Sequence, residues 1–240
     1  MANAALQIAT PAALPLNGRP VPPLEFGDRL TRDEFERRYE AMPEGIKAEL
    51  IEGRVYMASP VSCSHAQPHA SLLGWIVNYS AATPSTIALD NATLRLDLEN
   101  EPQPDVMLRI AHSKHAASRV SQDDYVEGAP ELVAEIAHSS ASYDLHEKLR
   151  AYRRHGIREY LVWRIRDAAI DWFVLRGGEY APLPADEQGI LKSEIFPGLW
   201  LDRPAMLSGD LSKVFTVLQL GLASPEHRPF VEQLAADSQR

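Results

Sequence analysis

The chain has 240 residues, of which 24 are Lys or Arg and 33 are Asp or Glu, so its formal net charge is −9. Hydrophobic residues make up 45% and charged residues 24%, which excludes disorder throughout and collagen-like repetition. These proportions are those of a globular protein with a sizeable core. The acid excess argues against a protein coated in positive charge, the simplest signature of a nucleic-acid binder.

The single cysteine, Cys63, cannot form an intramolecular disulfide, so the cytoplasm is the expected compartment. No apolar stretch approaches the roughly 20 residues that span a bilayer, so no membrane partner is expected. Residues 1–23 are rich in Ala and Pro and are expected to be a disordered leader. The main domain is then expected over 24–207, followed by a helical extension over 208–240.

The first expected elements are a helix and a hairpin. A capping box, Thr31 with Glu34, predicts a helix over 32–42, and Glu52-Gly53 predicts the turn of a hairpin over 48–57. A second helix, capped by Ser64, carries apolar residues at helical spacing. This helix is expected to be core scaffolding.

Strands and helices then alternate. Leucines at every second position predict a strand over 94–98, and further strands are expected over 106–110, 132–137, 160–165 and 170–175. A helix ending at Gly156 separates two of these strands and makes a βαβ unit, so the two should be parallel. Two late helices are expected over 208–220 and 229–236. The predicted class is α/β, with a central mixed β-sheet flanked by helices.

Several enzyme classes lose support because their motifs are missing from the sequence. It contains no phosphate-binding G-x-x-x-x-G-K-[ST] loop, no G-x-G-x-x-G dinucleotide turn and no G-x-S-x-G nucleophile elbow. Cys63, His65 and His69 have the spacing of zinc ligands on a helix. A closed structural zinc site needs four ligands, however, and no second cysteine exists, so ordinary core or surface histidines are the alternative.

Three carboxylates form the informative pattern. Asp105 follows Pro104 at the start of an apolar strand, and Glu135 lies inside another apolar strand, where a carboxylate is costly to bury without a partner. Glu49 opens the segment Glu-Leu-Ile-Glu-Gly. Carboxylates that converge need a cation between them, and Mg²⁺ or Mn²⁺ suits oxygen ligands. The alternatives are a turn aspartate for Asp105 and a surface ion pair for Glu49.

A lysine accompanies these carboxylates. Asp144, Lys148 and Tyr152 follow one another at i+4 spacing in the helix after the strand of Glu135. The stem of Lys148 can be buried while its ammonium reaches the strand. Metal-held carboxylates with a lysine nearby are what phosphodiester hydrolysis needs. The alternatives are a surface bridge from Lys148 to Asp144 and a purely structural core role for Tyr152.

The order and spacing of several short motifs carry a resemblance. They are Glu49-Leu50-Ile51-Glu52-Gly53, Ser59-Pro60 followed by His65, Gln103-Pro104-Asp105, Pro130-Glu131-Leu132-Val133-Ala134-Glu135, Lys148 through Tyr152 and Gly156 to Glu159-Tyr160, and Phe196-Pro197-Gly198-Leu199. This pattern, over roughly residues 31–202, resembles the Uma2 family (DUF820) of restriction-endonuclease-like proteins, a branch of the PD-(D/E)XK nuclease superfamily. The resemblance implies a restriction-endonuclease-like fold.

The resemblance also implies roles for individual residues. Asp105 matches the family's PD aspartate and Glu135 matches the acidic residue of the second motif. Ala137 stands where the superfamily's usual lysine would be, and Lys148 is the matching candidate on the following helix. His65 and Gln103 match family positions and are possible accessory residues with Tyr152. A second departure, His138-Ser139-Ser140 in place of Ser-Pro-Ser, removes no expected ligand.

The expected function is a Mg²⁺- or Mn²⁺-dependent endonuclease that hydrolyses phosphodiester bonds, most readily in DNA. Asp105, Glu135 and Glu49 would hold the metal and Lys148 would assist. An inactive nuclease-fold module that binds nucleic acid or protein is the alternative, and RNA is an alternative substrate. A homodimer would place two active sites on a duplex.

The net charge hides a basic stretch that a nucleic acid could contact. Residues 147–166 carry a charge of +5, which leaves −14 for the remainder of the chain. This stretch follows the strand of Glu135, where a phosphate backbone would approach the metals. The candidate nucleic-acid contacts within it are Arg150, Arg153, Arg154 and Arg158.

Overall fold

The computed structural model describes residues 20–58, 61–111, 116–137 and 144–238. Contacts divide them into two compact units. The smaller unit contains the described residues up to 58 together with 97–101, and the larger unit contains 61–96 and the described residues from 102 onward. The leader expected over 1–23 lies almost wholly outside the described residues, and the boundaries expected at residues 23 and 207 stay predictions.

The smaller unit is a helix and a hairpin, as the sequence predicts. Helix α1 (Arg32–Tyr39) precedes strands β1 (Ala48–Ile51) and β2 (Arg54–Met57), which pair antiparallel. The hairpin turns at Glu52 and Gly53, whose φ angles of 51° and 71° are both positive, as a tight two-residue turn requires. Its core is formed by five buried side chains: Leu24, Phe35, Ala48, Leu50 and Val55.

The capping box predicted for α1 is wrong. Thr31 occupies the N-cap position but its side chain makes no capping hydrogen bond. Glu34 is occupied elsewhere, because its carboxylate accepts hydrogen bonds of 2.7 Å from both Arg37 and Arg38. These hydrogen bonds lower the pKa of Glu34 to about 2. The helix also ends at Tyr39, three residues before the predicted Met42.

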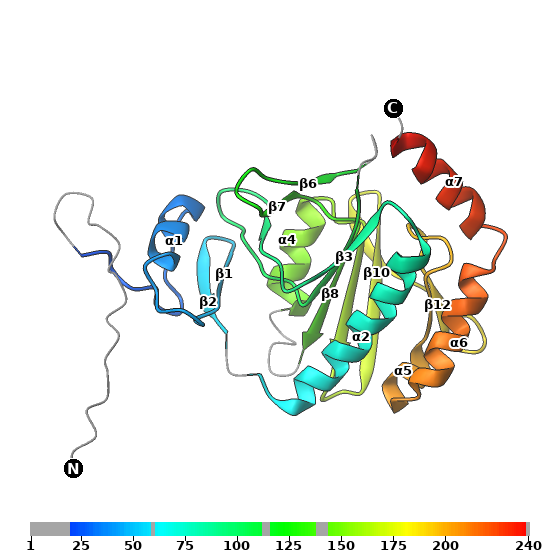
Figure 1. The fold of residues 1–240 in the computed structure, drawn as a ribbon. Coiled ribbons are helices and arrows are strands. Elements are labelled where there is room, and N and C mark those ends of the chain that lie inside the picture. Colours follow the sequence, from blue (N-terminus) through cyan, green and yellow to red (C-terminus); the bar gives the residue numbers. More distant parts are fainter. Residues whose placement is uncertain (1–19, 59–60, 112–115, 138–143, 239–240) are drawn as a thin grey trace, which may run out of the picture. The chain divides into compact units, whose positions relative to one another are not determined.

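A six-stranded mixed sheet organises the larger unit, in the order β11-β10-β9-β8-β5-β3 (Figure 1). The only parallel pair among these strands is β8 with β9, which confirms the predicted βαβ unit; the other pairs are antiparallel. The strands are β3 (Thr86–Asp90), β5 (Val106–Ile110), β8 (Leu132–Ala137), β9 (Glu159–Arg164), β10 (Ala169–Arg176) and β11 (Glu179–Pro182). The predicted α/β class with a central mixed sheet is confirmed.

Helices cover this sheet on both faces. The helices are α2 (Cys63–Ala82), the π-helical turn η2 (Asp144–Lys148), α4 (Leu149–Arg154), α5 (Arg203–Ser208), α6 (Leu211–Leu222) and α7 (His227–Ser238). Helices α2 and α6 pack with Val106, Leu108 and Ile136 in one core, whereas α4 packs with alternate residues of the same strands in another. The alternation follows from the two-residue side-chain period of a strand.

Smaller strands flank the main sheet. Strands β4 (Leu94–Arg95), β6 (Ser118–Val120) and β7 (Val126–Gly128) form one small sheet, and β12 (Ile190–Lys192) pairs with β13 (Trp200–Asp202). The strand predicted over 94–98 is therefore cut short. The reason is a turn in which the Asp97 carboxylate accepts hydrogen bonds from the Glu99 backbone N–H and the Asn100 side chain.

The helix predicted over 208–220 is also divided. Gly209, with a φ of 79°, ends α5 in the left-handed conformation that glycine adopts without a steric penalty. Asp210 then caps α6 by accepting from the Lys213 backbone N–H. Helix α6 packs closely against the Phe-Pro-Gly-Leu motif. Gly221 permits this approach, because a side chain at that position would collide with the carbonyl oxygen of Gly198.

Within the described residues, no helix is both long and apolar enough to cross a membrane.

Glu159, at the start of β9, is a fully buried carboxyl group of this fold. Its carboxylate accepts hydrogen bonds from the Ser193 hydroxyl at 2.8 Å and from the backbone N–H groups of Glu194 and Ile195. Burial nevertheless raises its pKa from 4.5 to about 7, against the lowering effect of these donors. At a given pH, Glu159 is therefore protonated more often in the folded protein than in the unfolded chain.

Glu159 should make stability fall as the pH rises. The folded state binds its proton more tightly than the unfolded state does, so its stabilising effect is complete below pH 4.5 and is lost as the pH rises through about 7. The loss is about 3 kcal/mol in the free energy of unfolding. Urea denaturation at several pH values should show this loss in the wild type, whereas Glu159→Gln, which stays neutral, should lack this component. Parallel pH curves for the two proteins would contradict the assignment.

Candidate active site

Two carboxylates lie side by side where β5 begins. Strands β5 and β8 are antiparallel with Val106 opposite Ala134, so Asp105 stands opposite Glu135. The Asp105 backbone N–H points to Oε2 of Glu135 at 3.4 Å, and the Ile136 backbone N–H donates to Oδ2 of Asp105 at 2.6 Å. Residues thirty positions apart in sequence thus share one corner of the sheet.

Lys148 is tied to this corner from the following helix. Its Nζ lies 2.9 Å from Oε1 of Glu135, and the two side chains are only 4% and 5% exposed. The Asp144 carboxylate is farther from Nζ, at 3.9 Å. The surface bridge to Asp144 considered from the sequence is therefore not what the structure contains, because Lys148 is buried and its nearer partner is Glu135.

Tyr152 and Asp144 complete the surroundings of this ion pair. The Tyr152 hydroxyl donates to Oε1 of Glu135 at 2.9 Å, so this core residue also contacts the site. Asp144 is 2% exposed, and its backbone carbonyl accepts from the Tyr160 hydroxyl at 3.1 Å. Asp144 and Lys148 bound a π-helical turn, a feature that occurs often at functional sites. The i+4 spacing of Asp144, Lys148 and Tyr152 is the sequence signal for this group.

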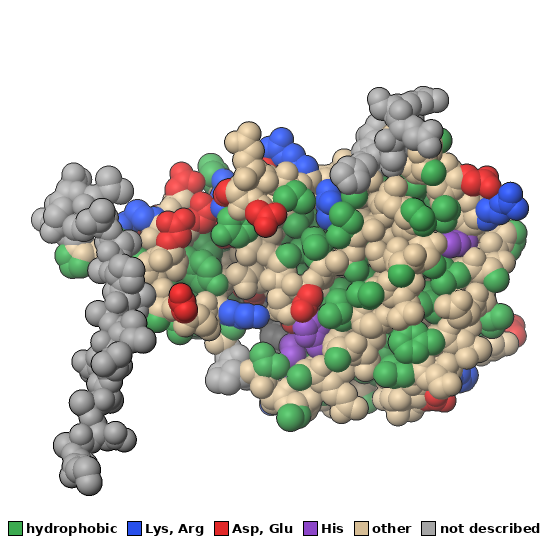
Figure 2. All heavy atoms as spheres, viewed as in Figure 1, with side chains coloured by type: hydrophobic (Ala, Val, Ile, Leu, Met, Phe, Trp, Pro, Cys, Tyr) green, Lys and Arg blue, Asp and Glu red, His purple; other side chains and the backbone are tan. Residues whose placement is uncertain are grey.

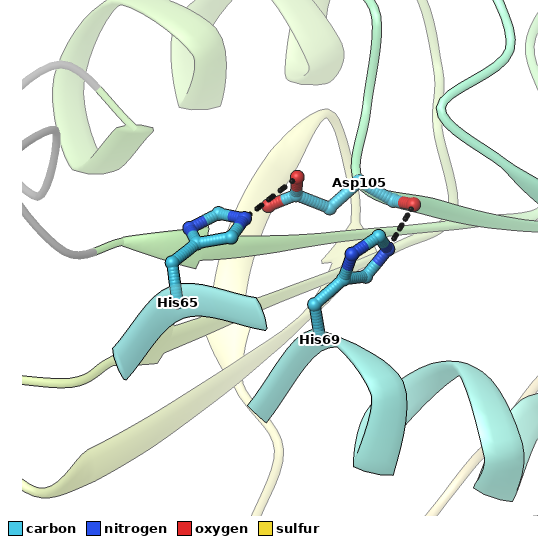
Figure 3. Close-up of side chains that lie close together, drawn as sticks. All are labelled: His65, His69 and Asp105. Carbon is cyan, nitrogen blue, oxygen red and sulfur yellow. Dashed lines mark hydrogen bonds and ion pairs between the residues drawn. The ribbon is translucent and has the colours of Figure 1, made fainter. Parts of the chain in front are cut away.

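Two histidines of α2 face Asp105 from the other side (Figure 3). Nε2 of His65 lies 3.4 Å from Oδ1 of Asp105, and Nε2 of His69 lies 3.0 Å from the Asp105 backbone oxygen. His69 also contacts the Asp90 carboxylate at 3.1 Å. The sequence did not single out Asp90, because only the pairing of β3 with β5 brings it beside Asp105.

These neighbours hold Asp105 in its ionised form. Burial alone would raise its pKa, but the contact with His65, the Ile136 N–H and the charge of Lys148 outweigh burial and lower it. Reciprocally, the Asp105 carboxylate raises the pKa of His65, against the effect of burial. A negative charge is thus maintained at the corner of the sheet.

The donor set at this corner fits a divalent cation. Asp105, which its neighbours keep ionised, and Glu135 supply carboxylate oxygens, the ligands that Mg²⁺ and Mn²⁺ prefer. His65, His69 and Asp105 each also offer one ligand atom, and these three atoms lie within 4.8 Å of one another. Cys63 is exposed and does not belong to this group, so the zinc set considered from the sequence is not the one brought together.

The remaining residues that the sequence predicts for the site have other contacts or lie elsewhere in the chain. The Gln103 side-chain amide donates to the Thr93 hydroxyl at 3.2 Å. Glu49 lies on β1, opposite Tyr56, in the smaller unit, and its role as a metal ligand stays a prediction. Ser59-Pro60 and His138-Ser139-Ser140 lie outside the described residues.

Acidic side chains neutralise much of the basic stretch. Arg153 pairs with Glu179, and Arg158 lies 3.3 Å from the buried Glu131 carboxylate. Arg150 and Arg154 are exposed on the α4 side of the unit. Figure 2 shows a different face, the one that α2 covers, and there too Lys and Arg side chains are scattered among acidic ones. The charge of +5 counted from the sequence therefore overstates the local positive field.

Adjacent strands of the mixed sheet carry an aspartate and a glutamate to one corner, and the following helical segment brings a lysine there. This is the architecture of a restriction-endonuclease-like nuclease fold. The chain belongs to the Uma2 family, whose model, described as "Putative restriction endonuclease", matches residues 32–204. Family and fold together indicate a nuclease of this type.

One solved structure shows the same fold. It is described as "a putative nuclease belonging to DUF820" from Anabaena variabilis ATCC 29413, and it is similar to this chain with a TM-score of 0.59 and 16% identity. The match covers 75% of this chain and 98% of the other. No curated protein matches the sequence.

The Lys148–Glu135 pair should be strongly coupled. Lys148→Met keeps the apolar stem but leaves the Glu135 carboxylate buried without its cation, so the free energy of unfolding should fall by about 3 kcal/mol. Glu135→Gln in the same protein removes the uncompensated charge, and the double variant should recover much of that loss. Urea denaturation measures both.

An exposed lysine provides the control for this comparison. Lys192 is 45% exposed and lies 3.4 Å from Asp186, so Lys192→Met should cost less than about 1 kcal/mol. If Lys148→Met were as mild as Lys192→Met, or if the double variant were less stable than Lys148→Met, the buried pair would not have the proposed coupling.

Proposed function

We propose that the protein is a divalent-metal-dependent endonuclease that hydrolyses phosphodiester bonds in DNA. The observation that carries the proposal is the juxtaposition of Asp105 and Glu135, with Nζ of Lys148 2.9 Å from the Glu135 carboxylate. Membership of the Uma2 family supports the same reaction class. The substitution at Ala137 does not weaken the proposal, because Lys148 supplies an ammonium group at Glu135.

Asp105 and Glu135 would hold the cation, which we propose to be Mg²⁺ or Mn²⁺, whereas Glu49, the third ligand predicted from the sequence, belongs to the other compact unit. A bound divalent cation lowers the pKa of water and offsets negative charge at the phosphoryl group. Asp105 suits this role because its neighbours keep it ionised. The backbone N–H of Ile136 fixes one of its oxygens and orients the other.

Lys148 and Tyr152 would act through position and charge. The two groups donate to the same oxygen of Glu135, each at 2.9 Å, and so hold that carboxylate in one orientation. The Lys148 ammonium would orient the attacking water or offset the charge that develops as the water oxygen bonds to phosphorus and the P–O bond to the leaving oxygen breaks. This charge is largest in the transition state, where its stabilisation accelerates the reaction.

DNA is the proposed substrate, and Arg150 and Arg154 are the proposed phosphate contacts on the α4 side. Arg153 and Arg158 are further proposed contacts, and each also pairs with a glutamate. With so few basic contacts, binding should be weak and strongly dependent on salt and on the divalent cation. A homodimer in the cytoplasm, presenting two sites to the two strands of a duplex, would suit such an enzyme.

Cleavage of DNA tests the proposal. Purified protein incubated with duplex and single-stranded DNA in Mg²⁺ or Mn²⁺ should cut at least one substrate, and a chelator should abolish cutting. Asp105→Asn and Glu135→Gln should each lower the rate at least about 100-fold, because each replaces a charged metal ligand by a neutral amide. Gel assays of initial rates measure these effects.

The matched control is Glu187→Gln, a carboxylate-to-amide change at an exposed loop residue, which should cut as the wild type does. RNA of the same sequence is incubated in parallel, and cutting of the RNA but not of the DNA would identify RNA as the substrate. Absence of cutting of every nucleic acid by folded, metal-loaded protein would contradict the proposal and favour an inactive nuclease-fold module. Cutting that survives Asp105→Asn and Glu135→Gln would contradict the assigned site.

A further inference from the structure

His65 approaches the Asp105 carboxylate at a distance near the long end of hydrogen bonding. Their nearest atoms, Nε2 and Oδ1, are 3.4 Å apart, beyond the usual range of about 2.7–3.2 Å for an N–H···O hydrogen bond. The His65 ring is directed at the Asp105 carboxylate from the first turn of α2 (Figure 3). Both side chains are partly exposed, at 20% and 15%, so solvent ions can reach them.

The separation suits two ligands of one metal ion. Ligand atoms at about 2.1 Å from a cation are roughly 3.0 Å apart in adjacent octahedral positions, the geometry usual for Mg²⁺ and Mn²⁺, so this pair would have to close by roughly 0.4 Å. An ion could therefore contact Nε2 of His65 and Oδ1 of Asp105 with little movement of either. The opposite oxygen, Oδ2, is already fixed by the Ile136 N–H. Asp105 thus directs Oδ1 toward His65.

His69 has a different role from His65. Its Nε2 is 3.0 Å from the Asp105 backbone oxygen and 3.1 Å from the Asp90 carboxylate, both ordinary hydrogen-bond distances. An Nε2–H group that donates to these oxygens cannot also bind a metal through that nitrogen. His69 therefore positions the backbone of Asp105, and His65 is the nitrogen that faces the carboxylate.

We propose that His65 is a nitrogen ligand of the cation at Asp105 and that it makes the site select Mn²⁺ over Mg²⁺. This inference rests on the proposed function for the presence of a cation at Asp105 and Glu135. Mg²⁺ takes oxygen ligands and keeps its waters, whereas the divalent transition metals, Mn²⁺ the most weakly of them, also bind nitrogen donors. Mn²⁺ accepts carboxylates and lies among the transition metals, so a set of two carboxylates and one imidazole favours it.

Metal binding and pulsed electron paramagnetic resonance test this inference. Calorimetry should show that wild-type protein binds Mn²⁺ at least about tenfold more tightly than Mg²⁺. The spectrum of bound Mn²⁺ should contain coupling to an imidazole nitrogen. His65→Gln should lose that coupling and about tenfold in Mn²⁺ affinity, with little change in Mg²⁺ affinity. His146→Gln, at an exposed histidine of η2, should behave as the wild type does.

The wild-type spectrum tests the inference whether or not the variant folds. Mn²⁺ bound without nitrogen coupling would overturn it, as would coupling that persists in His65→Gln. Either result would leave the nuclease proposal intact if DNA is still cut and cutting depends on Asp105. Conversely, nitrogen coupling that His65→Gln removes, in a protein that cuts no nucleic acid, would support this metal site while contradicting the proposed function.

Discussion

The buried ion pair between Lys148 and Glu135 is the interaction on which the site depends. Two charged groups that are 4% and 5% exposed can remain in a protein interior only if each compensates the other. The βαβ unit meets this requirement, since the helix that joins parallel strands β8 and β9 must cross the face from which Glu135 projects. Tyr152, one helical turn after Lys148, donates to the same oxygen and leaves the carboxylate a single orientation. One ion pair therefore links the crossover helix, the central strand and the proposed metal ligand.

Asp105 keeps its negative charge at the corner of the sheet, and several arginines of the larger unit pair with acidic side chains. Asp105 remains ionised because His65, the Ile136 N–H and Lys148 outweigh its burial. The arginines that could attract DNA to the same region are partly occupied, as Arg158 is by Glu131. In the proposed enzyme, a divalent cation would therefore contribute both to catalysis and to substrate binding. This coupling is consistent with a chain whose net charge is −9.

Local sequence patterns predicted the central elements well. An apolar strand interrupted by one glutamate, an aspartate after a proline and a helical i+4 series were enough to predict Glu135, Asp105 and Lys148 as candidates, and the structure brings these three together. Contacts set by tertiary structure could not be predicted, because no local pattern reports that α2 directs His65 at Asp105 or that β3 carries Asp90 to His69. The capping box failed for a related reason, since Glu34 has two arginine partners that a local motif does not weigh. Glu49 belongs to the other compact unit, and its part in the site stays a prediction.

The central claim is that Asp105 and Glu135 form one cation site beside an intact Lys148–Glu135 pair. A crystal structure of the protein with Mn²⁺, with anomalous scattering used to locate the metal, tests it most directly. We expect one strong peak at about 2.0–2.3 Å from an oxygen of each carboxylate, with Lys148 still in contact with Glu135. A well-ordered site with no metal peak between Asp105 and Glu135, or a metal bound elsewhere while these carboxylates keep only their protein partners, would contradict the claim.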